Sequence, residues 1–332
     1  MATNIWTGGE DESLFLVGAT VDTTSGHYRS SYTREDIKCA SGIQNGIYAE
    51  TPQRTLTSFW LTAQCYISGV ANNQIWLAFN DSSAVQRLYL ETANASNQML
   101  LIKQNAVGSK TTLLTSSANF PSASGIVRID IFIDYTTTGN TFALFIGGAL
   151  FMTYTGDITT DSATSLSTVL FGSSATGSGT GWSELRLQDT DTRGIQFIGT
   201  LVPAANGNTD AWDVGGVTNI NPTTINPANN NASGTATQLQ EYTIATPPTG
   251  NYTLLDFVVS TQASVGATGP QNIQMDVRTG GTSYPQSDAS PAPATAAAPV
   301  QTSIPLNPNT GIAWTEADIA NVGFNIGMKS AA

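Results

Sequence analysis

Residues 126–154 read IVRIDIFIDYTTTGNTFALFIGGALFMTY. At the start of this stretch, the apolar residues Ile129, Ile131 and Ile133 alternate with charged or aromatic residues. A period of two places the apolar side chains on one face of a β-strand. The pattern therefore predicts a strand with one face in a core.

The second half of the stretch predicts a β-hairpin. A Thr-rich turn ending at Asn140 leads to the alternating Phe142, Leu144 and Ile146, and Gly147-Gly148 follows. Two glycines suit a type I′ turn, which needs positive φ at both central positions. The whole stretch thus predicts three consecutive antiparallel strands.

Similar short strands are predicted throughout residues 55–200. Each is alternating or apolar, and each is bounded by Gly, Asn, Asp or Ser, which is typical of a β-sandwich. They are Ser58–Ser68, Gln74–Phe79, Gln86–Glu91, Gln98–Gln104, Thr111–Leu114, Ser167–Gly172 and Trp182–Gln188. The predicted fold is all-β, an antiparallel jelly-roll sandwich over residues 1–200.

The chain changes character after Pro203. Residues 201–238 are rich in Asn, Thr and Pro and are predicted to be a linker that is too polar to form a core. Strand patterns resume at residues 239–332, which predicts a smaller β-sandwich-like domain. It has one short helix, Glu316 to about Asn321, with Thr315 as the N-cap.

Composition excludes several classes of function. The chain has 12 basic and 24 acidic residues, a net charge of −12, and such a surface repels nucleic-acid backbones. No apolar run approaches the roughly 20 residues that span a bilayer, so membrane insertion is not expected. The N-terminus has neither the basic region nor the apolar region of a signal peptide, so we expect synthesis in a cytoplasm.

Cysteine and histidine are too few for a zinc site. The chain has one histidine, His27, and two cysteines, Cys39 and Cys65, whereas zinc needs three or four such ligands. Cys65 lies on the apolar face of its strand and is predicted to be a buried thiol, with a Cys39–Cys65 disulfide as the alternative. We expect no cofactor.

Two carboxylates lie in the first predicted strand of residues 126–154. Glycosidases use such a pair of acids. Asp130 and Asp134 share one strand face about 13 Å apart, whereas retaining catalysis needs about 5–5.5 Å between carboxyl groups. Phe132 occupies the position between them, where a third acid would be required. We expect a solvated strand face and no enzyme.

Asp189 and Asp191 are the candidate metal-ligating residues. Their D-x-D spacing can chelate Ca²⁺ through oxygen, but no Gly and Glu follow at EF-hand positions. The segment predicts a turn out of the sandwich.

Exposed aromatic residues are the candidate contacts for a glycan or another subunit. Trp60, Trp76 and Tyr89 are predicted to lie on strand faces opposite the apolar rows. Aromatic faces of this kind stack on sugars or pack against neighbouring subunits.

The block from Phe59 to Gly199 resembles the laminin-G-like/concanavalin A-like sandwich. The matching motifs are FWLTAQCYIS, IVRIDIFIDY, TFALFIGGALF, VLFGSS and WSELRLQDTDTRG. A narrower resemblance extends to the ending NPNTGIAWTEADIANVGFNIGMKS, Asn307–Ser330. This combination is similar to tailed-bacteriophage virion proteins that follow a laminin-G-like domain with a P-x-T-G-x-x-W-T motif.

The resemblance implies a non-enzymatic structural protein on the virion exterior, in the tail, a tail fibre or the capsid decoration. Its partners would be copies of itself, as a homo-oligomer, and other virion proteins. The alternative is a lectin-like module that recognises a host surface glycan.

Overall fold

The computed structural model divides the chain into two compact units, which we call the N-terminal unit (Ala2–Gly199) and the C-terminal unit (Thr200–Ala332). The structure describes residues 4–8, 21–22, 39–40, 48–67, 73–93, 97–121, 126–136, 140–172, 180–191, 193, 199, 201–220, 230–247, 253–266, 268–286, 290–291 and 298–332. His27 lies outside the described residues, as does the side chain of Cys39.

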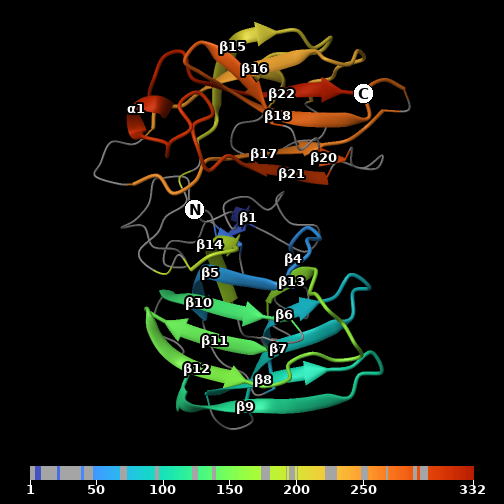
Figure 1. Cartoon of the computed structure of the whole chain (residues 1–332), viewed down its shortest axis with the longest axis vertical. Coiled ribbons are helices and arrows are strands. Elements are labelled where there is room, and N and C mark those ends of the chain that lie inside the picture. The colour runs from blue at the N-terminus through green and yellow to red at the C-terminus, as the bar shows by residue number, and fades with distance from the viewer. Residues whose placement is uncertain are drawn as a thin grey trace. The chain divides into compact units, whose positions relative to one another are not determined.

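Two antiparallel sheets form the N-terminal unit (Figure 1). The larger sheet has the order β12-β11-β10-β5-β14-β3-β2, and β1 also pairs with β14. Its strands are β1 (Asn4–Gly8), β2 (Val21–Asp22), β3 (Cys39–Ala40), β5 (Ser58–Ile67), β10 (Ile126–Asp134), β11 (Thr141–Ile146), β12 (Ala149–Thr155) and β14 (Thr180–Gln188).

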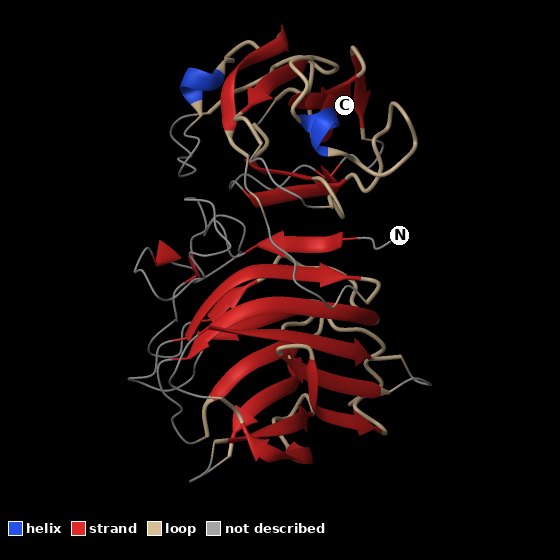
Figure 2. Cartoon of the chain, turned by 90° about the vertical axis from the view of Figure 1, so that its left-hand side faces the viewer, coloured by secondary structure: helices blue, strands red, loops and turns tan. Residues whose placement is uncertain are grey.

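The smaller sheet has the order β4-β13-β6-β7-β8-β9. Its strands are β4 (Tyr48–Glu50), β6 (Ile75–Asn80), β7 (Gln86–Thr92), β8 (Gln98–Gln104), β9 (Lys110–Asn119) and β13 (Thr168–Gly172). Strands distant in sequence are neighbours in both sheets, as expected of a jelly roll. The predicted all-β antiparallel sandwich is confirmed, and Figure 2 shows its strands side-on.

The sandwich core lies between these two sheets. It consists of the apolar side chains that the period-two pattern predicts to point inward. Ile129, Ile131 and Ile133 of β10 are fully buried, as are Phe59 and Leu61 of β5. Cys65 is also buried in this core, at 1% exposure. Burial of each such side chain contributes about 1.5–3 kcal/mol, so the period-two rows account for the assembly of the sheets.

Strand β9 forms one edge of the smaller sheet. Seven of its ten residues are exposed, and its register against β8 shifts at two places, between Gln98 and Leu100 and between Leu101 and Ile102. Such irregularities bend and twist a strand.

The hairpin loop between β11 and β12 has the conformation that the sequence predicts. Gly147 has φ 58° and Gly148 has φ 84°, so both glycines occupy the left-handed region that a type I′ turn needs. A Cβ at either position would meet no other atom within 4 Å. A side chain here would therefore cost backbone strain rather than a clash.

We expect Gly148→Val to lower the free energy of unfolding of the N-terminal unit by about 1–2 kcal/mol, because an L-residue in the left-handed region is strained. Urea unfolding is the measurement. Gly148→Asn should cost less, since asparagine tolerates this region better; equal losses for both variants would contradict the assignment of strain.

The C-terminal unit contains a sheet of order β15-β16-β22-β18-β19, with β20 paired to β18, and a separate β17-β21 pair. The elements are β15 (Pro203–Asp210), η3 (Val217–Asn219), β16 (Leu239–Ile244), β17 (Val258–Ala263), β18 (Asn272–Thr279), β19 (Thr282–Pro285), β20 (Ser290–Pro291), β21 (Ala298–Ser303), α1 (Glu316–Ile319) and β22 (Asn325–Ala331). Within the described residues, no helix has the length and apolar character that crossing a membrane requires.

Part of the predicted linker belongs to this sheet. Strand β15 (sequence PAANGNTD) pairs with β16, and Val214 and Ala232 form a further antiparallel bridge. The prediction of a linker over residues 201–238 is wrong for these residues. A polar segment forms an edge strand because ladder hydrogen bonds need only backbone groups, and at an edge its side chains need no core.

The C-terminal unit has its own core around Trp314, which is 3% exposed. The Trp314 ring contacts Phe257 and Phe324 at centroid distances of 5.5 and 5.8 Å. The predicted helix begins where expected, with Thr315 and Asp318 forming a reciprocal capping box, but it ends at Ile319. The cap satisfies backbone N–H groups that the short helix leaves unpaired.

Candidate functional site

The outer face of the larger sheet, away from the core, carries most of the chemistry predicted for the N-terminal unit. Cross-strand register aligns the outward residues of β14, β5, β10 and β11 in rows. One row contains Gln188, Trp60, Phe132 and Ala143, and the next contains Arg186, Thr62, Asp130 and Phe145.

Three aromatic rings gather on this face, and we call them the aromatic patch: Trp60, Phe132 and Phe145. Trp60 lies 5.1 Å from Phe132 and 5.9 Å from Phe145 between ring centroids. All three side chains are partly exposed, and Leu150, beside Phe145 on β12, is 57% exposed. The patch is an apolar surface that water reaches.

Arg193 lies over the aromatic patch. Its guanidinium carbon is 4.9 Å from the Trp60 ring centroid and 4.2 Å from that of Phe145, which is cation–π distance. The guanidinium also binds Asp191, with Nη2 donating to Oδ2 at 2.7 Å and Nε to both carboxylate oxygens at 3.0 Å. The turn after β14 therefore places a charge-paired arginine on the rings.

Asp191 is thus a partner of Arg193. Partial burial acts to raise the pKa of Asp191, but hydrogen bonds from Arg193 and its positive charge outweigh burial, so the pKa lies below its ordinary value. Asp189, the residue directly after β14, is exposed. The described residues contain no group of three or more His, Cys, Asp or Glu side chains arranged for a metal.

Beside the patch, Asp130 is fully buried and hydrogen-bonded. Its Oδ1 accepts from Thr62 Oγ1 at 2.9 Å and from Arg128 Nη2 at 2.8 Å, and its exposure is 0%. The expectation of a solvated strand face is wrong for Asp130, because Arg128 and Thr62 replace water as its partners. With no exposed surface, this carboxylate is out of reach of a substrate lying on the face.

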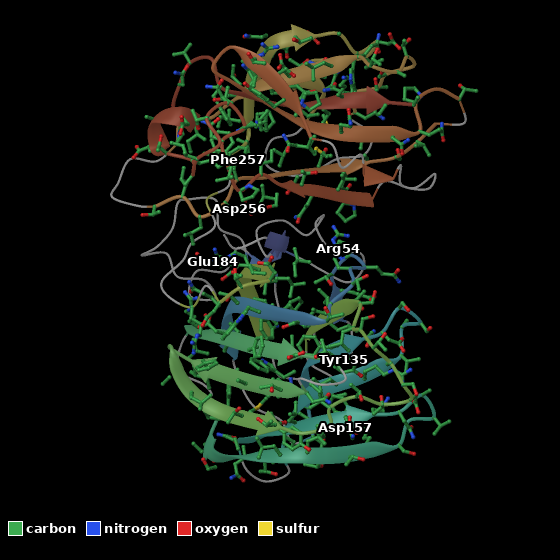
Figure 3. All side chains as sticks on the ribbon, in the orientation of Figure 1. Arg54, Tyr135, Asp157, Glu184, Asp256 and Phe257 are labelled. Atoms are coloured by element: carbon green, nitrogen blue, oxygen red, sulfur yellow. The ribbon has the colours of Figure 1, made fainter. Side chains whose placement is uncertain are left out.

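A β-bulge in β14 adds a second acid to the face. Between Ser183 and Arg186 the register against β5 shifts, and Glu184 has φ 52°. Because of the bulge, the Glu184 carboxylate reaches the outer face and accepts from Gln64 Nε2 at 3.2 Å. Glu184, labelled in Figure 3, is only 3% exposed.

Of the three predicted aromatic contacts, the structure places only Trp60 on this face. Trp76 is 2% exposed in the sandwich core, 4.9 Å from Trp182 and from Phe120. The prediction that Trp76 faces away from the core is wrong, because a bulge between Ile75 and Leu77 reverses the alternation there.

Tyr89 does lie on the outward side of β7, but in the smaller sheet and fully buried. It packs with Ala78 and Ile102, and Lys110 Nζ lies 5.3 Å from its ring centroid. Tyr89 is therefore unavailable for stacking on a ligand.

Phe132, Phe145 and Arg193 were not predicted as site residues. Each phenylalanine occupies an outward position of its strand, as Trp60 does. The alternation of side chains along each strand would have shown this. The proximity of the rings, however, depends on the cross-strand register. Arg193 follows the strand end, and nothing in the sequence places it over the rings.

The C-terminal unit contains a second charged cluster. Glu241 and Asp276, both 0% exposed, face each other across Gly327 in one cross-strand row. Arg278 Nε donates to Glu241 Oε1 at 2.8 Å, and Ser283 Oγ donates to Asp276 Oδ1 at 2.7 Å. Glycine fits between them because a Cβ on residue 327 would lie 2.6 Å from the Gln240 carbonyl oxygen.

Asp276 holds a proton at mildly acidic pH. Burial raises the pKa of Asp276 to about 6, the hydrogen bond from Ser283 opposes this, and the negative charge of Glu241 adds to it. Two buried carboxylates in contact cannot both ionise cheaply. The pair lies inside the unit, so its consequence is for stability.

Comparisons with known proteins give structural likeness only. No family model matches the chain, and no curated protein matches it. An endo-β-1,4-glucuronan lyase from Trichoderma reesei matches 57% of this chain and 96% of its own, with a TM-score of 0.40 at 13% identity. The cellulose induced protein Cip1 matches 52% and 85%, with a TM-score of 0.38 at 14% identity.

A third solved structure is a carbohydrate-binding module of Bacillus subtilis, CBM66. It matches 52% of this chain and 95% of its own, with a TM-score of 0.34 at 10% identity. At these scores and identities, none of the three carries an argument about ligand or activity.

Proposed function

We propose that the chain is a non-enzymatic carbohydrate-binding module whose ligand surface is the aromatic patch. The observation that carries this proposal is the cluster of three partly exposed rings with a guanidinium fixed over two of them. Water contact with such a surface is unfavourable, so a ligand with its own apolar face gains free energy by covering it.

The chemistry of the patch favours a sugar. Aromatic rings stack on the C–H faces of a pyranose. At the rim, the Arg193 guanidinium offers a donor, and the Thr153 hydroxyl, exposed on β12 and already donating to the Phe142 carbonyl, offers an acceptor. Arg193 and Arg128 are already paired with Asp191 and Asp130. The patch therefore suits a neutral glycan better than an acidic one.

A binding role fits this face better than catalysis. General acid–base chemistry needs an ionisable group within reach of the substrate, but Asp130 is fully buried and Glu184 nearly so. The described residues of this face offer aromatic rings and charged groups that are already paired within the protein. Such groups can bind a ligand but do not activate one of its bonds.

The virion context remains a separate proposal, and its support is the sequence resemblance alone. If the chain belongs to a bacteriophage particle, the aromatic patch would serve as a host-glycan contact, and the partners would include copies of the chain. Subunit packing over the patch is the competing use of the same surface.

The test is a glycan array with the full chain, followed by titration of the strongest ligand against Trp60→Ala. We expect the substitution to weaken binding about tenfold or more, because buried Trp contacts dominate many interfaces. Trp212→Ala, which removes a partly buried tryptophan from the C-terminal unit, is the matched control and should bind as wild type.

Two outcomes would sink the carbohydrate proposal. One is an array with no ligand for the wild-type chain. The other is retained affinity in Trp60→Ala while circular dichroism shows the sandwich intact. If the wild type forms oligomers that Trp60→Ala does not, the patch is a subunit interface.

A further inference from the structure

We propose that a pocket beside α1 in the C-terminal unit binds a neutral polyhydroxyl ligand, such as one sugar residue, at a site separate from the aromatic patch. The pocket has a volume of about 320 Å³, within the range of about 300–1,000 Å³ typical of small-molecule sites. Its walls come from the β18–β19 turn, the loop before α1, and α1 with the residues that follow it.

The β18–β19 turn leaves room for the pocket. Gly280 and Gly281 have φ 57° and 81°, a second type I′ turn of two glycines. A Cβ on Gly280 would lie 2.5 Å from Asn309 Nδ2. The bare backbone of Gly280 therefore lets the Asn309 amide pack directly on the turn, where both line the pocket.

Three polar side chains in the pocket are each fixed by a hydrogen bond within the protein. Tyr284 Oη donates to Asn309 Oδ1 at 3.0 Å, and the Gly323 N–H donates to Asn321 Oδ1 at 2.8 Å. Asp318 Oδ2 accepts from the Thr315 N–H at 2.8 Å and from its hydroxyl at 2.7 Å.

These bonds leave one atom of each side chain for a ligand. The structure gives no hydrogen bond within the described residues to Nδ2 of Asn309, Nδ2 of Asn321 or Oδ1 of Asp318. The pocket thus presents amide donors and a carboxylate acceptor on side chains whose rotamers are already set. Such preorganisation lowers the entropy cost of binding.

These donors and this acceptor match hydroxyl groups on adjacent carbon atoms of a ligand. A hydroxyl can donate to the carboxylate and accept from an amide at the same time. The Asp318 charge opposes phosphate or carboxylate ligands, and the buried Phe324 ring supplies an apolar wall. A neutral ligand with several hydroxyls satisfies all of these groups.

Most of the residues that line the pocket lie in Asn307–Ser330, the segment that resembles the ending of phage virion proteins. Trp314 and Thr315 of this ending have packing and capping roles. Asn309 and Asn321 are exposed, so the packing of the core does not require them.

The experiment is a two-dimensional amide NMR titration of the full chain with methyl glycosides of glucose, galactose, mannose and N-acetylglucosamine. Glucuronate and glucosamine serve as charged comparators. We expect saturable shifts of the Gly280 and Gly281 amides and of the Asn309 and Asn321 side chains with at least one neutral glycoside. The same shifts should persist in Trp60→Ala, which separates this site from the aromatic patch.

Ala317→Leu is the blocking variant, because Ala317 lines the pocket and is exposed. It should weaken the titration about tenfold or more, since a leucine occupies ligand space. Ala320→Leu, also exposed on the C-terminal side of α1 but not lining the pocket, should titrate as wild type. Absence of shifts with every neutral glycoside, shifts with a charged comparator alone, or an unaffected Ala317→Leu would each overturn the proposal.

Discussion

Replacing Trp314 with alanine is expected to destabilise the C-terminal unit strongly while the N-terminal unit keeps its stability. Trp314 is almost completely buried, contacts Phe257 and Phe324, and donates from Nε1 to the Ile304 carbonyl at 2.6 Å. Removing a buried tryptophan costs about 3–5 kcal/mol. Since domains are stable by only about 5–15 kcal/mol, this loss approaches the stability of a small unit.

The two units can be followed separately by fluorine NMR of the chain labelled with 5-fluorotryptophan. Trp212 reports on the C-terminal unit, and Trp182 reports on the sandwich core. In Trp314→Ala the Trp212 signal should move to its unfolded position at a much lower urea concentration, with the Trp182 transition unchanged.

Trp314→Phe is the matched control. It keeps a ring in the cavity and loses the hydrogen bond to Ile304, so about 1–2 kcal/mol is expected. An unchanged Trp212 transition in the alanine variant would show that the core around Trp314 does not hold the unit together.

The C-terminal unit should also lose stability as pH rises through about 6. The pKa of Asp276 is about 6 in the folded chain against 3.8 as its ordinary value. A folded pKa above the unfolded one means that folding takes up a proton, so the stabilisation is complete below about pH 4 and disappears above about pH 6. The shift corresponds to a change on the order of 3 kcal/mol between pH 4 and pH 8.

Asp276→Asn should remove most of this pH dependence. The amide resembles the protonated carboxyl, since it can accept from Ser283 and donate to Glu241, and it carries no charge. Urea unfolding at several pH values, read from the Trp212 signal, measures the slope. Asp189→Asn, at an exposed aspartate of the N-terminal unit, is the control and should leave that slope unchanged. A pH slope in Asp276→Asn equal to that of wild type would assign the effect to another group.

The sequence predicts the sandwich because its strands follow a strict period of two. Ile129, Ile131 and Ile133 are all in the core, and Gly147-Gly148 forms the predicted turn. The same rule fails at Trp76, where one extra residue in a bulge changes the side to which the following residues point.

The site is less predictable because it joins strands that are far apart in sequence. Trp60 and Phe132 become neighbours only through the register of β5 against β10. Likewise, Glu241 and Asp276 meet only because β22, from the end of the chain, inserts Gly327 between β16 and β18. No local pattern contains this information.

The edge strand β9 has a consequence for self-association. An unpaired strand edge can template pairing with another copy of the chain, and flat, regular edges are the most prone to it. With two interruptions of its ladder and Lys110 at its start, β9 is a poor template for such extension of the smaller sheet. If copies of this chain assemble, we expect them to meet through side chains rather than by continuing the smaller sheet at β9 from one copy into the next.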